Sequence, residues 1–112
     1  MSEPAELPPR RVAELLREAD AQLVDVRTPE EHGAGRISGD VHIELEELPA
    51  QAQTLERERP VVFYCRSGAR SALATGAFRQ AGFEAYNLHG GLLAWVASGL
   101  PIVPEDGHVA GH

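Results

Sequence analysis

The chain has 112 residues, of which 43% are hydrophobic and 24% charged, values typical of a single globular domain. Its net charge of −7 argues against a surface that binds nucleic acid or an anionic membrane, and no apolar run reaches the roughly 18–20 residues that a bilayer span requires. The one cysteine cannot form a disulfide within the chain, so we expect a cytoplasmic protein.

Helices and strands are predicted to alternate along the first half of the chain. After a flexible arm over residues 1–8, apolar residues at helical spacing predict a helix over 10–19, and residues 23–26 have the β-branched content of a short buried strand. Thr28 followed by Pro29 predicts the start of a helix of about one turn. A second short strand is expected at 41–43. A helix is expected over 44–58, with Pro49 limiting its regularity.

The second half continues the alternation. We expect a strand at 61–64, a helix at 71–81, a short strand at 84–87 and a last helix at 92–97. This order predicts an α/β fold with a mainly parallel sheet, in one domain over residues 9–102. Residues 103–112 are expected to form a flexible tail, in which His108 and His112 are solvated. Neither a metal nor a cofactor is expected.

Charge is unevenly distributed in this acidic chain. No aspartate or glutamate occurs between Arg59 and Phe83, whereas this segment carries four arginines: Arg59, Arg66, Arg70 and Arg79. A locally basic segment in an acidic protein indicates a site for a small anion.

Cys65 lies inside this basic segment, at the end of an apolar run and the start of a polar turn. A thiol with an ordinary pKa of about 8.5 is mostly protonated at neutral pH, so a nucleophilic cysteine needs groups that stabilise its anion. The backbone amides of residues 66–71 and the start of the following helix could converge on the sulfur, with Arg66 and Arg70 adding positive charge. Gly68 gives the turn access to positive φ. Cys65 is therefore a candidate nucleophile. No histidine lies next to Cys65 in the sequence as an obvious base. His89 could serve only if the fold brought it close to Cys65, and the alternative is that it is a loop histidine.

Three segments together resemble the rhodanese-like sulfurtransferases: L-V-D-V-R-T-P-E-E-H (23–32), C-R-S-G-A-R-S (65–71) and L-H-G-G-L-L-A-W (88–95). The resemblance implies a rhodanese-like fold, with helices on both faces of the sheet. It also implies that Cys65 takes a sulfane sulfur from a donor such as thiosulfate, becomes a persulfide, and passes the sulfur to cyanide, a small thiol or a protein cysteine. The donor would bind along the loop, at Arg66, Ser67, Gly68, Ala69, Arg70 and Ser71. Asp25 and Arg27 would support the loop, while Trp95 is interpreted as a core residue.

The chain departs from the common family pattern at residues 35–40. These read G-R-I-S-G-D where relatives often read G-H-I-P-G-A, so Arg36, Ser38 and Asp40 are expected to affect the preference for a donor or partner.

Two other functions remain open. Phosphatases and arsenate reductases of related type have a C-x5-R loop, but only four residues separate Cys65 from Arg70, which favours a ring around a single sulfur. A non-catalytic or sulfur-relay module is the second alternative, and the presence of Cys65 with both arginines weighs against a loss of chemistry. Because no second thiol is available, the sulfur acceptor must be another molecule.

Overall fold

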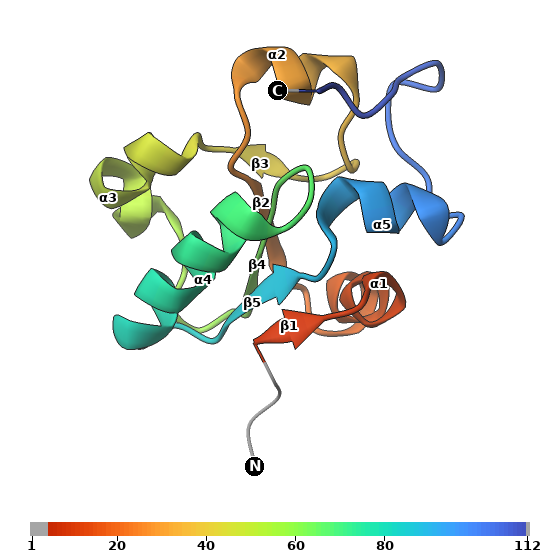
Figure 1. The fold of residues 1–112 in the computed structure, drawn as a ribbon. Coiled ribbons are helices and arrows are strands. Elements are labelled where there is room, and N and C mark those ends of the chain that lie inside the picture. Colours follow the sequence, from red (N-terminus) through yellow and green to blue (C-terminus); the bar gives the residue numbers. More distant parts are fainter. Residues whose placement is uncertain (1–4, 112) are drawn as a thin grey trace.

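The computed structural model describes residues 5–111 and is built on one five-stranded parallel sheet. Its strands are β1 (Glu6–Leu7), β2 (Gln22–Asp25), β3 (Val41–His42), β4 (Val61–Tyr64) and β5 (Ala85–Leu88). They lie in the order β1-β5-β4-β2-β3, and every neighbouring pair is parallel (Figure 1). The predicted α/β fold with a parallel sheet is confirmed.

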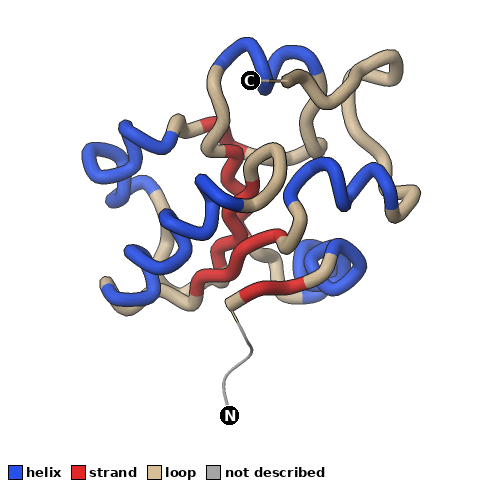
Figure 2. The backbone as a smooth tube through the Cα atoms, in the orientation of Figure 1, coloured by secondary structure: helices blue, strands red, loops and turns tan. Residues whose placement is uncertain are grey.

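Helices cover both faces of the sheet. They are α1 (Pro9–Glu18), α2 (Pro29–Ala34), α3 (Leu48–Gln51), α4 (Ala69–Gln80) and α5 (Gly91–Ala97). α3 and α4 lie on one face, α1 and α5 lie on the other, and α2 lies beyond one end of the strands (Figures 1 and 2). None of the helices in the described part of the chain has the length and apolar character needed to cross a membrane.

Each face of the sheet has its own hydrophobic core. Side chains of a strand point alternately to opposite faces, so in β4 Phe63 packs on the α4 side with Phe78, whereas Val62 packs on the α5 side with Trp95. All four residues of β4 have no exposed surface, as expected for a central strand of a parallel sheet.

The central strands also determine where the polar residues emerge. β4 ends at Tyr64, immediately before Cys65, and its neighbour β2 ends at Asp25, which is in register with Tyr64. Sites in parallel sheets form at this carboxyl edge, because the loops that follow neighbouring strands meet there.

Both ends of the described chain differ from the flexible arm and tail that the sequence suggested. Leu7, in the predicted arm, is 2% exposed and pairs in β1 with β5. In the predicted tail, Val103 exchanges two backbone hydrogen bonds with Arg36 (N···O distances of 2.9 and 2.7 Å), and the amide of His108 donates to the carbonyl of Ala34 (2.9 Å). Tertiary hydrogen bonds to distant segments therefore hold these stretches. Residues 1–4 of the arm and His112 lie outside the described residues.

The helix expected over 44–58 is broken into three short pieces. A 3₁₀ turn at Leu45–Glu47 leads into α3, and another at Ala52–Thr54 follows it. Pro49 lies in the first turn of α3, where a helix does not need the N–H group that proline lacks. Without that N–H, however, the helical hydrogen bonds cannot continue from the preceding turn into α3.

Candidate active site

The loop after β4 wraps hydrogen-bond donors around the sulfur of Cys65. The residue is 1% exposed. The amide of Gly68 donates to Sγ at 3.1 Å, and the hydroxyl of Ser71 donates to it at 3.3 Å. Gly68 adopts φ of +104° at the N-cap of α4, a conformation that side chains other than glycine rarely tolerate.

This environment favours the thiolate. Burial alone would raise the pKa of Cys65, but hydrogen bonds from the Ser71 hydroxyl and from the amides of Ser71, Gly68 and Ser67 outweigh it and hold the pKa below its ordinary value. The 12-residue helix α4 also begins at this loop, with its positive end toward the sulfur. That Cys65 acts as a nucleophile remains a prediction, which the lowered thiol pKa favours.

The opposite side of the loop is held by α5 and β5. The amides of Leu92 and Leu93 donate to the carbonyls of Cys65 and Arg66, at 2.8 and 3.1 Å. The side-chain amide of Asn87 donates to the carbonyl of Gly68 at 3.0 Å. Because these carbonyls face donors outside the loop, the amides of the loop can face the sulfur.

Close packing of α5 on the loop requires a glycine. Gly91 has φ of +65°, and a Cβ atom on it would lie within 2.6 Å of the carbonyls of Cys65 and Arg66. This contact gives a physical reason for the second glycine of the segment L-H-G-G-L-L-A-W.

Arg70 is engaged by a residue that the sequence analysis did not assign to the site. Its two terminal nitrogens donate to the two carboxylate oxygens of Glu31, each at 2.9 Å. Glu31 has a side chain only 3% exposed and also closes a capping box with Thr28 at the start of α2. Burial opposes its ionisation, but Arg70 and Thr28 lower the pKa of Glu31 to about 2. Donor binding by Arg70 remains a prediction.

The other predicted loop residues line the turn in different ways. Ser67 and Ala69 are exposed, Ser71 is fully buried, and Arg66 is partly exposed. Within residues 5–111, Arg66 forms no ion pair, and its buried Nε has no hydrogen-bond partner. Arg66 is thus the loop guanidinium that a carboxylate does not neutralise.

Asp25 and Arg27 form a buried ion pair at the end of β2, and their support of the sulfur loop remains a prediction. Nε and Nη2 of Arg27 donate to the two carboxylate oxygens of Asp25 at 2.8 and 2.7 Å, and both side chains have no exposed surface. Burial disfavours both charges, but the pairing prevails: the pKa of Asp25 lies below its ordinary value and that of Arg27 above it. Nη2 of Arg27 also donates to the carbonyl of Gly35 at 2.7 Å. The pair thus fastens the end of β2, beside Tyr64, to the segment after α2.

Comparison with known proteins assigns the family. The model described as rhodanese-like domain matches residues 8–98. The chain belongs to the rhodanese-like family. The resemblance inferred from three motifs and the fold that it implied are both confirmed.

Individual relatives of this rhodanese-like chain cover most of its length. A protein from Allochromatium vinosum named sulfurtransferase is 42% identical over 89 residues, which cover 79% of this chain and 83% of the relative. Thiosulfate sulfurtransferase GlpE from Pseudomonas paraeruginosa is 37% identical over 84 residues, 74% of this chain and 76% of the relative. The crystal structure of a rhodanese-related protein from Thermoplasma volcanium has a TM-score of 0.83 and 29% identity, covering 89% of this chain and 98% of that one.

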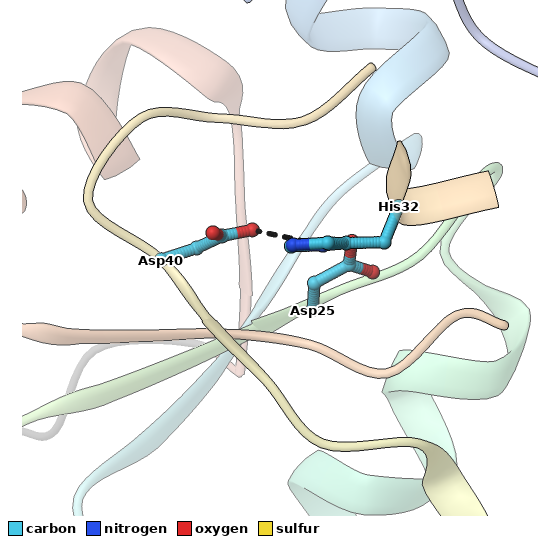
Figure 3. Close-up of side chains that lie close together, drawn as sticks. All are labelled: Asp25, His32 and Asp40. Atoms are coloured by element: carbon cyan, nitrogen blue, oxygen red, sulfur yellow. Dashed lines mark hydrogen bonds and ion pairs between the residues drawn. The ribbon is translucent and has the colours of Figure 1, made fainter. Parts of the chain in front are cut away.

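A polar cluster next to the Asp25–Arg27 pair contains Arg36 and Asp40, two of the residues that depart from the common family pattern. His32 lies between two carboxylates, with Nδ1 2.8 Å from Asp25 and 3.7 Å from Asp40 (Figure 3). The hydroxyl of Tyr64 donates to Asp40 at 2.6 Å, and Arg36 lies 3.5 Å from the other oxygen of Asp40. Arg36 and Asp40 therefore form an ion pair with each other in this rhodanese-like domain.

The cluster is close enough to surround a metal ion, since its ligand atoms lie within 4.8 Å of one another. However, Asp25 already binds Arg27, and Asp40 accepts from Tyr64 and faces Arg36. Two arginines balance the two carboxylates, so the charges are compensated by the protein itself. Burial raises the pKa of Asp40, although Tyr64, His32 and Arg36 oppose the rise.

The neighbours of His89 in sequence, Leu88 and Gly90, pack beside Gly68 of the sulfur loop, but the His89 side chain is directed to solvent and Glu6. The His89 side chain is 71% exposed and its Nδ1 lies 3.1 Å from Glu6. This position favours the interpretation of His89 as a loop residue. Trp95 is buried and donates from Nε1 to the carbonyl of Pro101 at 2.8 Å, in agreement with a core role.

Glu31 and Asn87 are the loop-supporting residues that sequence reasoning missed. Glu31 carried a signal, because Thr28 and Glu31 have the spacing of a capping box, but that signal pointed only to helix initiation. Asn87 is a buried polar residue on a strand, and such residues need a hydrogen-bond partner. Its partner, Gly68, lies 19 residues away in sequence, beyond the reach of a local pattern.

Proposed function

We propose that this chain is a sulfurtransferase in which Cys65 carries a sulfane sulfur as a persulfide. The observation that supports the proposal most directly is the set of donors around Sγ, where the Gly68 amide and the Ser71 hydroxyl lie 3.1 and 3.3 Å away. Donors that stabilise a thiolate can also stabilise a persulfide anion. The charge of that anion lies on the outer sulfur, one bond beyond Sγ.

In the first half-reaction, the Cys65 thiolate attacks the outer sulfur of a sulfane donor. A bond forms between Sγ and that sulfur while the donor's own S–S bond breaks, and the leaving group departs with the bonding electrons. With thiosulfate the leaving group is sulfite, and the enzyme retains the persulfide. Arg66 and the loop amides would hold the anionic donor.

In the second half-reaction, an acceptor attacks the outer sulfur and Cys65 leaves as a thiolate. The acceptor is an external nucleophile, namely cyanide, a small thiol or another protein's cysteine, since the chain has no second cysteine. The cycle is a two-step covalent route with alternating substrates. Because it needs a reduced thiol, we assign the protein to the cytoplasm.

Phosphate or arsenate chemistry fits the geometry less well. Only four residues lie between Cys65 and Arg70, and the Arg70 guanidinium is already bound at both ends by Glu31. A tetrahedral oxyanion would have to compete with a buried carboxylate for that arginine.

Intact-mass spectrometry after incubation with thiosulfate tests the proposal. The unmodified protein should gain the mass of one sulfur atom, and cyanide should remove it with release of thiocyanate. Cys65→Ser is the matched control and should gain nothing. An unmodified Cys65 at millimolar donor, or equal labelling of the variant, would refute a Cys65 persulfide.

A further inference from the structure

We propose that Glu31 sets the donor preference of this site, favouring an organic hydropersulfide (R–S–SH) over the thiosulfate dianion. The inference rests on the proposed function, since it concerns the molecule that loads Cys65. It follows from which charges at the loop are free and which are already paired.

Arg70 contributes little free positive charge to the loop. Both of its terminal nitrogens bind the carboxylate of Glu31, and that carboxylate is buried and fixed by Thr28. At neutral pH the two charges cancel at short range. A pair held by two parallel hydrogen bonds is also costly to open for a second anion.

Arg66 is then the one unneutralised guanidinium of the loop in the described part of the chain. A thiosulfate dianion approaching the Cys65 thiolate brings three negative charges together against Arg66 and the loop amides. An organic hydropersulfide carries at most one negative charge on its sulfurs, and none when protonated. The charge balance of the site therefore suits the less charged donor.

The surface beside the loop suits an organic group. α5 packs on the loop and exposes a leucine there: Leu93, whose amide binds the Arg66 carbonyl, is 40% exposed. Sulfite, the leaving group from thiosulfate, would gain nothing from this side chain, whereas the carbon skeleton of a thiol can contact it.

The loading step balances without a further reagent. Cys65 attacks the terminal sulfur of R–S–SH, the bond between its two sulfurs breaks, and the thiolate R–S⁻ leaves with the electron pair. The proton stays on the transferred sulfur, giving Cys65–S–SH, and the leaving thiolate takes a proton from water. One sulfur moves at unchanged oxidation level.

The test compares two donors, thiosulfate and cysteine hydropersulfide, by the rate at which each loads Cys65 in intact-mass experiments. Glu31→Gln keeps the shape and a carbonyl acceptor for Thr28 but removes the charge. It should raise the thiosulfate-to-hydropersulfide ratio of loading rates about tenfold, because a full positive charge becomes available to a dianion. Glu30→Gln removes the same charge from an exposed position on the same helix and should leave the ratio unchanged.

The double variant Glu31→Gln/Arg70→Met removes both charges of the pair and should return the ratio to near that of the unmodified protein. A merely structural role of Glu31 would slow both donors equally. If both donors load Cys65 and Glu31→Gln leaves their ratio unchanged, the inference is wrong while the sulfurtransferase proposal stands. If neither donor loads Cys65, the sulfurtransferase proposal itself fails.

Circular dichroism and thermal melting will show whether Glu31→Gln is folded. Should it unfold, the unmodified protein decides the question, with its ratio normalised to that of a free small thiol reacting with the same two donors. A normalised ratio that favours thiosulfate would overturn the inference, and one that favours the hydropersulfide by about tenfold or more would support it.

Discussion

Neutralising Asp25 should destabilise the fold more than any exposed charge change. In Asp25→Asn, Arg27 keeps its charge while it has no exposed surface. The NH₂ and carbonyl groups of the new asparagine must face the three N–H groups of Arg27 that, in the unmodified protein, donate to the carboxylate oxygens of Asp25. Nη1 of Arg27 already lacks a hydrogen-bond partner, so no spare acceptor is at hand. Leaving one member of a buried pair uncompensated costs about 3–5 kcal/mol.

Urea unfolding followed by circular dichroism measures this cost. With a slope of about 1–3 kcal/mol/M for a small domain, the midpoint of Asp25→Asn should fall by roughly 2 M. Asp20→Asn is the matched control, because Asp20 meets Arg59 on the surface at 3.4 Å with its side chain 88% exposed, and such pairs contribute at most about 1 kcal/mol. The double variant Asp25→Asn/Arg27→Met removes both charges and should recover much of the loss. Equal midpoints for Asp25→Asn and Asp20→Asn would refute the reasoning.

Three further predictions concern the loop, the pH dependence of stability and the chain end. Ser71→Ala should slow alkylation of Cys65 by iodoacetamide about tenfold at a pH below the thiol's pKa, because it loses one hydrogen bond to the thiolate, whereas Ser67→Ala should not; equal rates would refute this. Glu31 ionises with a pKa of about 2 in the folded state and 4.5 ordinarily, so it contributes roughly 3 kcal/mol above pH 4.5. This contribution is lost as the pH falls toward 2, so the difference in unfolding free energy between the unmodified protein and Glu31→Gln should shrink over that range. A constant difference would contradict it. Gly35→Ala should cost about 1–3 kcal/mol in urea unfolding, because its Cβ would collide with the His108 backbone, whereas Gly33→Ala, in an open position within α2, should be neutral or stabilising.

The parts of the fold that the sequence predicted well are those specified by neighbouring residues. The apolar run at 61–64 identified the central strand, and Thr28 with Pro29 identified the start of α2. The turn after Cys65 was also predictable, because Gly68 and the following helical pattern define its geometry locally.

The parts that sequence reasoning missed depend on contacts between distant residues. β1 has only two residues, too few for a periodic pattern, and it is specified by pairing with β5 about 80 residues later. The Glu31–Arg70 pair joins residues 39 apart, so a rule about local charge placed Arg70 in the donor site without its partner. The segment between Arg59 and Phe83 has no acidic residue, but α2 supplies Glu31 to Arg70 from another part of the chain.

The two chain ends support the sulfur loop from opposite sides. Glu6 of β1 accepts from the same Asn87 amide that holds the Gly68 carbonyl, each at 3.0 Å. The segment that contains Val103 and His108 is fastened to α2, and α2 carries the carboxylate that binds Arg70. A version of this domain trimmed to residues 9–102 would keep every residue of the sulfur loop while losing both supports. For protein engineering, the unit to transplant, or to fuse to another protein, therefore extends at least from residue 6 to residue 108.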